Sequence, residues 1–295
     1  MILPDSFTFK SLRIAGGRLI QEALSGQTMT KATVRIDEGV QTEDALIVCC
    51  FPSVGMVSSV VAHFLIDHLE LKYIGGVTHP DLPALCLVNE GVPLPPIRAY
   101  SGDPVCTVDG CDKVILLMSE LMVPDPLVHD IVTSMFDWSK DAKTSKGVLI
   151  DAFARKGMKG GLNGQEPMVD YEDTDEIDVL GVGATPEMRT MLEELGITML
   201  EQGVIKGITG VLLGEANRRG RNILSIMVEA DPRYPDARAA AVIIEKLNTL
   251  LPIVNLDHEP LLKEAMALEE QLKMLVDGAE SSDSPSAASA SMLYG

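Results

Sequence analysis

The sequence has few aromatic residues and few basic residues. Aromatic residues make up 4% of the 295 positions, whereas methionine occurs 15 times, so aliphatic side chains and methionine must fill the core. Lys and Arg number 24 against 43 Asp and Glu, which gives a net charge of −19. This balance argues against nucleic acid or an anionic membrane as the main partner, because both require a concentrated basic surface.

Cysteine is also scarce, and its spacing carries no metal or redox signature. The five cysteines form an odd set without a CxxC pair. Cys49 and Cys50 are neighbours in an apolar run, where the side chains of a strand alternate between its two faces. We interpret the cysteines as small buried hydrophobic residues in a reducing cytoplasm, and we expect no metal site and no cofactor.

Targeting and membrane signals are missing as well. The N-terminus lacks the basic start and long apolar stretch of a signal peptide, and no window approaches 18 uncharged apolar residues. The sequence therefore predicts a cytoplasmic protein with no membrane-spanning segment.

Short apolar runs alternate with amphipathic stretches along most of the chain. Runs such as ALIVCCF at 45–51 and VILLMS at 114–119 have no polar face, which is typical of strands buried on both sides. We expect further strands at 71–77, 85–89, 97–100, 147–151, 179–182 and 223–228, and helices at 56–69, 125–140, 186–195, 207–220, 236–250 and 259–276. This pattern predicts a three-layer α/β domain with a largely parallel or mixed sheet.

Two parts of the chain differ from this pattern. Residues 156–176 are rich in glycine and then in acidic residues, and we expect an exposed insertion or long loop. Residues 277–292 are rich in Ser, Ala, Asp and Gly, which is typical of a disordered tail. The predicted organisation is an α/β domain at 1–257, an amphipathic helix at 258–276 and a flexible tail at 277–295.

Two helix starts carry capping signals. Asp125 can cap the helix at 125–140, with Pro126 in its first turn, and Thr185 can cap the helix at 186–195.

The loop after the first buried strand is a candidate site. Pro52, Ser53 and Gly55 join that strand to a helix, and backbone N–H groups at such a junction can bind an anion or a small molecule. The nucleophile elbow G-x-S-x-G is not matched, because Phe51 stands at its first glycine position. A plain turn is the competing interpretation.

Four glycines, Gly203, Gly207, Gly210 and Gly214, follow neither the Walker nor the dinucleotide-binding pattern. We expect them to let a helix pack closely against the sheet; a phosphate cradle is the alternative.

No catalytic constellation is evident. No two of the five histidines have HxH or HxxxH spacing, and His79, next to Asp81, is the best general-base candidate. A small-molecule enzyme would have its site at the 51–55 loop, with His79, Asp81 or Glu120 as acid or base.

The helix at 259–276 has a heptad seam of Leu261, Ala265, Leu268, Leu272 and Leu275. It is too short for a free-standing coiled coil, so it either packs on the domain or joins subunits of a homo-oligomer.

The last three residues, Leu293, Tyr294 and Gly295, place an apolar residue and a tyrosine at the tip of a polar tail. A flexible tail of this length reaches on the order of 24 Å. Its free carboxylate could pair with a lysine in a partner's pocket, as in a docking peptide.

Four segments resemble the family of proteasome assembly chaperone two. They are ALIVCCFPSVGMVSSVVAHFLIDHLELKYIGGV, NEGVPLPPIRAYSG, GVIKGITGVLLGEANRRG and ADPRYPDARAAAVIIEKLNTLL. Together they span about residues 40 to 255, in the family's order, and the archaeal members are the most similar.

The resemblance implies a mixed sheet flanked by helices, like that of purine nucleoside phosphorylases. It also implies an ATP-independent, non-enzymatic chaperone or adaptor that binds the α subunits of the 20S proteasome. The tail then resembles the hydrophobic–Tyr–any-residue motif of proteasome activators. Leu293 would fill an apolar pocket, Tyr294 would pack and hydrogen-bond, and the Gly295 carboxylate would pair with a pocket lysine.

Overall fold

The structure is a computed structural model, and it describes only part of the 295 residues. Described are 32–102, 113–144, 146–154 and 177–250, the backbone of 159–163 and 166–170, and Leu256, Glu259 and Lys263. The tail with Leu293, Tyr294 and Gly295, most of the helix at 258–276, Cys106 and Cys111 lie outside these residues. The predictions made for them remain predictions.

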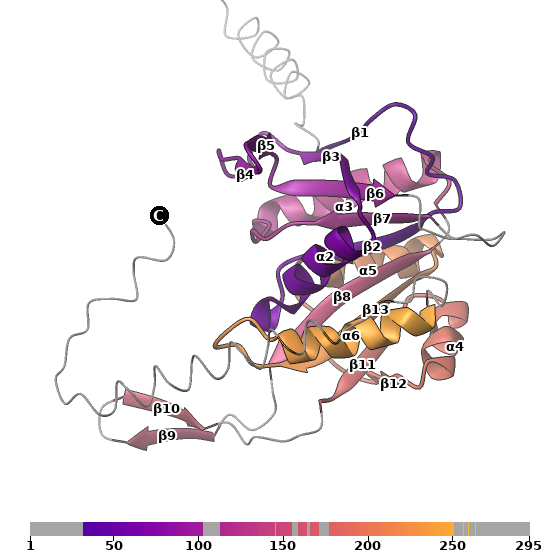
Figure 1. Ribbon diagram of the computed structural model, residues 1–295. Helices are drawn as coiled ribbons and strands as arrows, with labels where there is room; N and C mark the ends of the chain where they lie inside the picture. Colours follow the sequence, from indigo (N-terminus) through magenta and orange to yellow (C-terminus); the bar gives the residue numbers. More distant parts are fainter. Residues whose placement is uncertain are drawn as a thin grey trace, which may run out of the picture.

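A nine-stranded mixed sheet forms the centre of the molecule (Figure 1). In order across the sheet, its strands are β1 (Thr33–Ile36), β3 (Lys72–Thr78), β6 (Ile97–Gly102), β7 (Val114–Met118), β2 (Leu46–Cys50), β8 (Gly147–Ala154), β13 (Ile223–Ala230), β11 (Val179–Gly183) and β12 (Thr198–Met199). The four central strands β7, β2, β8 and β13 are parallel. Antiparallel strands β6 and β11 adjoin them on either side.

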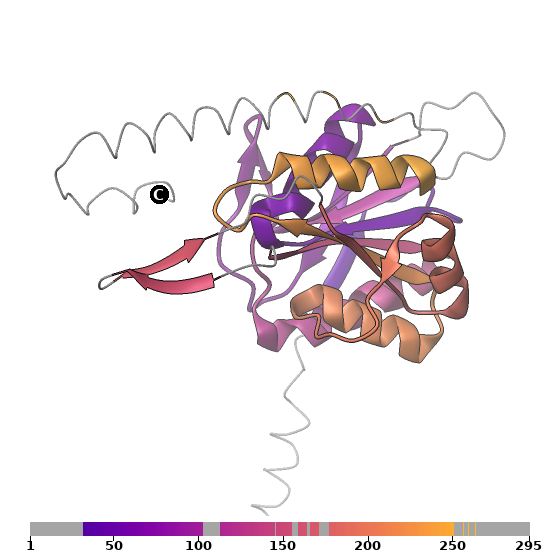
Figure 2. The same cartoon turned by 90° about the horizontal axis from the view of Figure 1, so that it is seen from below.

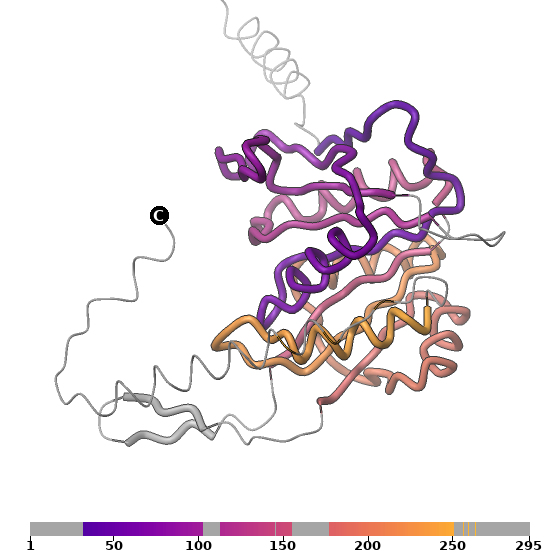
Figure 3. Tube along the Cα trace, viewed as in Figure 1, coloured from indigo at the N-terminus to yellow at the C-terminus, as the bar shows by residue number. Residues whose placement is uncertain are grey.

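Helices cover both faces of the central strands, because parallel neighbours are joined by crossover connections that contain helices. Every residue of β2 and β7 is buried, as the continuous apolar runs predict. The sequence alternation also assigns the two faces correctly: Cys50 belongs to the core on one side of β2, and Cys49 to the core on the other. In the Cα trace, β2 lies between strands from much later in the chain (Figure 3).

Two layers of helices enclose the sheet (Figure 2). Helices α2 (Val57–His68) and α6 (Ala237–Leu250) pack side by side on one face. Helices α3 (Asp125–Asp141) and α5 (Gly207–Arg219) cover the other. Helix α4 (Pro186–Glu194) adds Met188 and Leu192 to the first face, near the β12 edge. The predicted three-layer mixed α/β fold is therefore confirmed.

The segment at 156–176 is more regular than expected. It contains strands β9 (Lys159–Asn163) and β10 (Glu166–Asp170), which pair antiparallel. Only two residues, Gly164 and Gln165, separate them in the sequence, which is the spacing of a tight hairpin. The glycine content obscured this signal. A second hairpin joins β4 (Leu87–Asn89) to β5 (Val92–Leu94).

One of the two predicted helix caps is confirmed. The Thr185 hydroxyl accepts the Met188 N–H at 3.4 Å and caps α4. Asp125, in contrast, is the first helical residue of α3 and not its cap, because Pro124 occupies the capping position. The Asp125 charge still lies at the positive end of the helix dipole.

Candidate functional site

The loop after β2 is held by a serine pair. The Oγ of Ser53 accepts the Ser58 N–H at 3.0 Å and lies 2.9 Å from the Ser58 hydroxyl oxygen. The Ser58 hydroxyl in turn lies 2.8 Å from the carbonyl oxygen of Ile150, to which it donates. Ser53 thereby fixes the start of α2 against β8, and the described residues place no histidine beside it.

The same loop has a left-handed backbone at two consecutive residues. Gly55 has φ of 59° and Met56 has φ of 49°. A Cβ atom on Gly55 would lie 2.7 Å from the carbonyl oxygen of Asp231, and the Gly55 carbonyl accepts the Asp236 N–H at 2.8 Å. Glycine at 55 is therefore required by the close approach of the chain that leads into α6.

A pocket of about 520 Å³ opens at the carboxyl ends of the central strands. Its polar groups come from Ser53, Asp125, Asp151, Lys206 and Thr209. The remaining lining residues are mostly apolar: Phe51, Pro52, Val54, Met122, Val123, Ala152, Phe153, Val204, Ile205, Gly207, Ile208 and Met227. Ligands of open α/β sheets bind at this edge of the strands, so the pocket is the candidate site.

Asp151 is the less exposed of the two carboxyl groups in this pocket. It follows the buried run of β8, and its Oδ1 accepts the Ala152 N–H at 2.8 Å. Burial raises its pKa, although hydrogen bonds from the Ala152 N–H and the Thr209 hydroxyl oppose the rise. No motif or spacing in the sequence singles out Asp151. Its place as the last residue of the predicted strand at 147–151, on the edge that the 51–55 loop also occupies, could have revealed it.

The rim of the pocket exposes large apolar side chains. Met122 is 71% exposed and Val204 is 85% exposed, and both line the pocket. Apolar side chains gathered around a cavity are typical of a binding surface, because their hydration is unfavourable.

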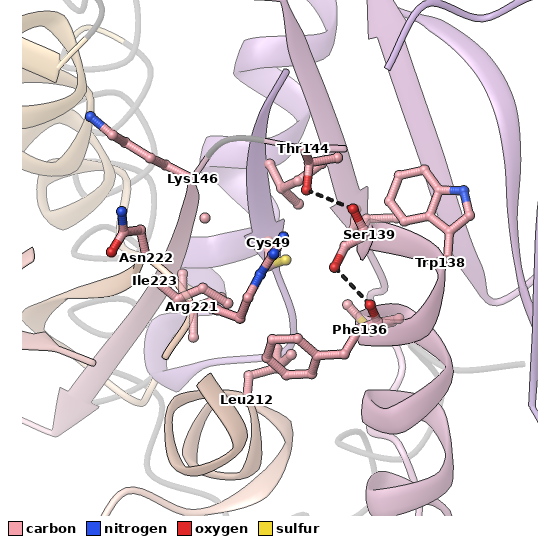
Figure 4. A pocket seen from close by; sticks show the side chains of 15 residues that line it. Cys49, Phe136, Trp138, Ser139, Thr144, Lys146, Leu212, Arg221, Asn222 and Ile223 are labelled. Carbon is pink, nitrogen blue, oxygen red and sulfur yellow. Dashed lines mark hydrogen bonds between the residues drawn. The ribbon is translucent and has the colours of Figure 1, made fainter. Parts of the chain in front are cut away.

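A second pocket lies between α3 and α5, near the amino ends of the strands (Figure 4). Its volume is about 50 Å³, and the buried thiol of Cys49 lies against it. Burial raises the pKa of Cys49 to about 12, so the thiol is not a nucleophile. Ser139 and Thr144 bond to backbone carbonyls of α3. This pocket is too small for an organic ligand.

His79 does not belong to the candidate site. Its Nδ1 accepts the Asp81 N–H at 3.0 Å, and its Nε2 lies 3.2 Å from Asp130 Oδ2. Asp130 also accepts the Ala32 N–H, which ties the start of β1 to α3. His79 and Asp81 thus lie together, but in a contact that links β3, β1 and α3.

Glu120 belongs to a third cluster. It pairs with the buried Arg98 of β6 and lies 3.0 Å from Nε2 of His63. Burial opposes its ionisation, yet the hydrogen bonds from His63 and Arg98 and the charge of Arg98 outweigh it and lower the pKa of Glu120 to about 2. The acid and base candidates therefore do not converge on the 51–55 loop.

The glycine pattern and the exposed cysteine require corrections. A Cβ atom would meet no atom within 4 Å at Gly207 and Gly214. At Gly203 and Gly210 it would meet Leu200 and Ile205, which precede α5. These glycines do not bring α5 close to the sheet, so that expectation was wrong. Cys86 is exposed and not buried, because it lies beside the β4–β5 hairpin outside the core.

Neither a metal cluster nor a membrane helix is found in the described part of the chain. No group of three His, Cys, Asp or Glu residues there could hold a metal ion. No helix in the same residues is both long and apolar enough to cross a membrane.

Solved structures of archaeal proteins share this fold. PbaA of Pyrococcus furiosus, described as an archaeal homolog of proteasome-assembly chaperone, is 31% identical. The match covers 85% of this chain and 94% of PbaA, with a TM-score of 0.69. PbaB of the same organism, described as an archaeal proteasome activator, is 19% identical over 84% of this chain and 99% of PbaB, with a TM-score of 0.67, and so shows the fold alone.

Among curated proteins, an uncharacterized protein of Methanocaldococcus jannaschii is 26% identical over 238 residues, which are 81% of this chain and 88% of the relative. PbaA is described as a chaperone homolog, in agreement with the expectation of a non-enzymatic protein. The PAC2 family model matches residues 47–276, which include the whole nine-stranded sheet apart from its edge strand β1 and the first residue of β2. On this evidence, the chain belongs to the PAC2 family.

Proposed function

We propose that this protein is an ATP-independent chaperone or adaptor that binds the α subunits of the 20S proteasome. The observation that carries the proposal is the similarity to PbaA, a proteasome-assembly chaperone homolog, at 31% identity over 94% of that protein. The separate positions of His79, Glu120 and the 51–55 loop favour a binding function over catalysis.

In this proposal the tail makes the docking contact. Leu293 inserts into an apolar pocket between α subunits, Tyr294 packs beside it, and the Gly295 carboxylate pairs with a lysine. A charge-assisted contact at a free C-terminus combines specificity with modest affinity. Several copies of the chain in a homo-oligomer would present several tails, and simultaneous docking would raise the avidity.

The test compares four forms of the full-length protein for binding to the 20S proteasome of its source organism. They are the intact chain, a chain ending at Met292, Tyr294→Ala and the matched control Ser291→Ala. Native mass spectrometry would count the bound copies. We expect the intact chain and the control to bind, and the truncated chain and Tyr294→Ala to bind at least tenfold more weakly.

Two results would contradict the proposal in different ways. Equal binding of the intact and truncated chains would move recognition to the folded body and remove the tail from the mechanism. Absence of binding by all four forms would refute a direct role at the 20S proteasome.

A further inference from the structure

The pocket at the carboxyl ends of the strands has no role in the tail mechanism, yet it has the form of a ligand site. Its volume of about 520 Å³ lies within the range of about 300–1,000 Å³ that small-molecule sites occupy. Apolar walls come from Phe51, which directly follows β2, and from Phe153 of β8 and Met227 of β13. A ligand with an apolar body would therefore remove its surface from water there.

The pocket also carries charges of both signs. The Asp151 carboxylate accepts two hydrogen bonds from the protein, and a carboxylate offers about four acceptor positions. It therefore keeps acceptor capacity for a donor from a ligand. Lys206, which precedes α5, makes no ion pair with another described residue, and Asp125 adds a second negative charge.

The backbone beside Lys206 adds hydrogen-bond donors to the positively charged part of the pocket. Lys206 precedes the first residue of α5, and no side chain caps that helix. The N–H groups of its first turn are donors without an intrahelical partner. Gly207 leaves open space there, since a Cβ atom would meet nothing within 4 Å.

The exposed rim is an independent sign of a ligand. Met122 and Val204, which come from different segments, are 71% and 85% exposed on the same pocket. A bound apolar group between them would cover surface that is otherwise hydrated.

We propose that this pocket binds a free amino acid with an apolar side chain. The ammonium group donates to Asp151, and the carboxylate is held by Lys206 and the first turn of α5. The side chain lies among Phe51, Phe153 and Met227, and Met122 and Val204 close over it. A zwitterion pairs with the charges of both signs. A simple anion would leave the Asp151 carboxylate without a cationic partner and would be repelled by it.

The first experiment titrates the full-length protein with three matched probes by isothermal calorimetry. L-Leucine carries both charges, N-acetyl-L-leucine lacks the ammonium and L-leucinamide lacks the carboxylate. We expect saturable binding of leucine and at least tenfold weaker binding of each blocked form.

Variants then locate the site. Asp151→Asn and Lys206→Gln should each weaken leucine binding at least tenfold. Asp141→Asn and Lys140→Gln, two exposed positions at the far end of α3, are the matched controls and should leave it unchanged. Burial penalises the charge of Asp151, so Asp151→Asn should also raise the melting temperature, which separates lost binding from lost folding.

Several outcomes would overturn the proposal. Failure of leucine to bind at millimolar concentration would exclude the amino acid. Equal binding of N-acetyl-L-leucine would show that only an anion is recognised, as for a peptide C-terminus such as the tail. Leucine binding that survives both pocket substitutions would place it elsewhere. Each result is independent of proteasome binding, which the tail variants test separately.

Discussion

At the scale of single residues, Gly55 shows how one position shapes the site. Its left-handed backbone and its contact with the Asp231 carbonyl join the loop after β2 to the chain entering α6. Asp236 completes this junction, because its carboxylate accepts the N–H groups of Asp231 and Ala239 at 2.9 Å. The pocket loop and the start of α6 therefore depend on one residue that lacks a side chain.

We predict that Gly55→Ala destabilises the protein by about 2–4 kcal/mol. The cost combines left-handed strain of about 1–2 kcal/mol with the displacement of a backbone carbonyl. Gly220→Ala is the control, because Gly220 has φ of 63° and open space around it, and it should cost only about 1 kcal/mol. Urea unfolding of both variants measures the difference. Equal losses would show that the contact with Asp231 contributes nothing.

At the scale of elements, a buried ion pair connects the antiparallel border of the sheet to a helix. Arg98 lies on β6, and Glu120 follows β7 and also contacts His63 of α2. The Arg98 side chain is 3% exposed, and its Nε has no hydrogen-bond partner among the described residues. Glu120 is thus the group that compensates a buried cation, and its loss should cost more than the loss of a surface pair.

We predict that Glu120→Gln lowers the free energy of unfolding at pH 7 by about 2–3 kcal/mol. The folded state lowers the pKa of Glu120 from its ordinary value of 4.5 to about 2. Its contribution is therefore present above pH 4.5 and is lost as the pH falls towards 2.

The measurement is the free energy of unfolding of wild type and variant between pH 2 and pH 7. The two free energies should converge as the pH falls from 4.5 towards 2. Glu43→Gln, which removes an exposed ion pair with Lys143, is the control and should change the free energy of unfolding little at any pH. A constant difference from pH 7 to pH 2 would exclude Glu120 as the titrating group.

The elements differ in how well the sequence predicts them. The central strands and the helices around them follow from unbroken apolar runs and helical periodicity, because burial on both faces leaves a direct mark on composition. The β9–β10 hairpin and the capping residue of α3 were missed, since glycine and proline signals admit several local structures. The pocket could not be predicted without the order of the strands in the sheet. That order brings Asp151 and Ser53 to the same pocket across about 100 residues of sequence, and no local pattern encodes it.

At the scale of the whole molecule, charge dominates. A net charge of −19 repels other copies of the chain, whereas the exposed apolar residues of the β4–β5 hairpin, Val88 at 68% and Val92 at 54%, favour contact with a partner. Association of copies must therefore overcome long-range repulsion.

We predict that added salt increases homo-oligomer formation. Raising the ionic strength from about 0.01 M to about 1 M shortens the screening length from about 30 Å to about 3 Å. Light scattering of the full chain across this range should show a rising mass. The same measurement on a chain lacking residues 258–276 would show how much the heptad seam contributes to oligomer formation. A mass that falls with salt would instead indicate that ion pairs hold the copies together.

The strand order also governs how the chain folds during synthesis. The first central strand to be synthesised, β2, cannot pair with its neighbour β8 until about 100 further residues have been made. Helix α2 cannot pack against α6 until about 180 further residues have been made. Chain synthesis proceeds at roughly 5–20 residues per second, so the delay between α2 and α6 is about 9–36 s. During it the apolar face of α2 and the edge of β2 are open to wrong pairings, so a protein proposed to assist assembly would itself be a candidate client of the ribosome-bound folding machinery.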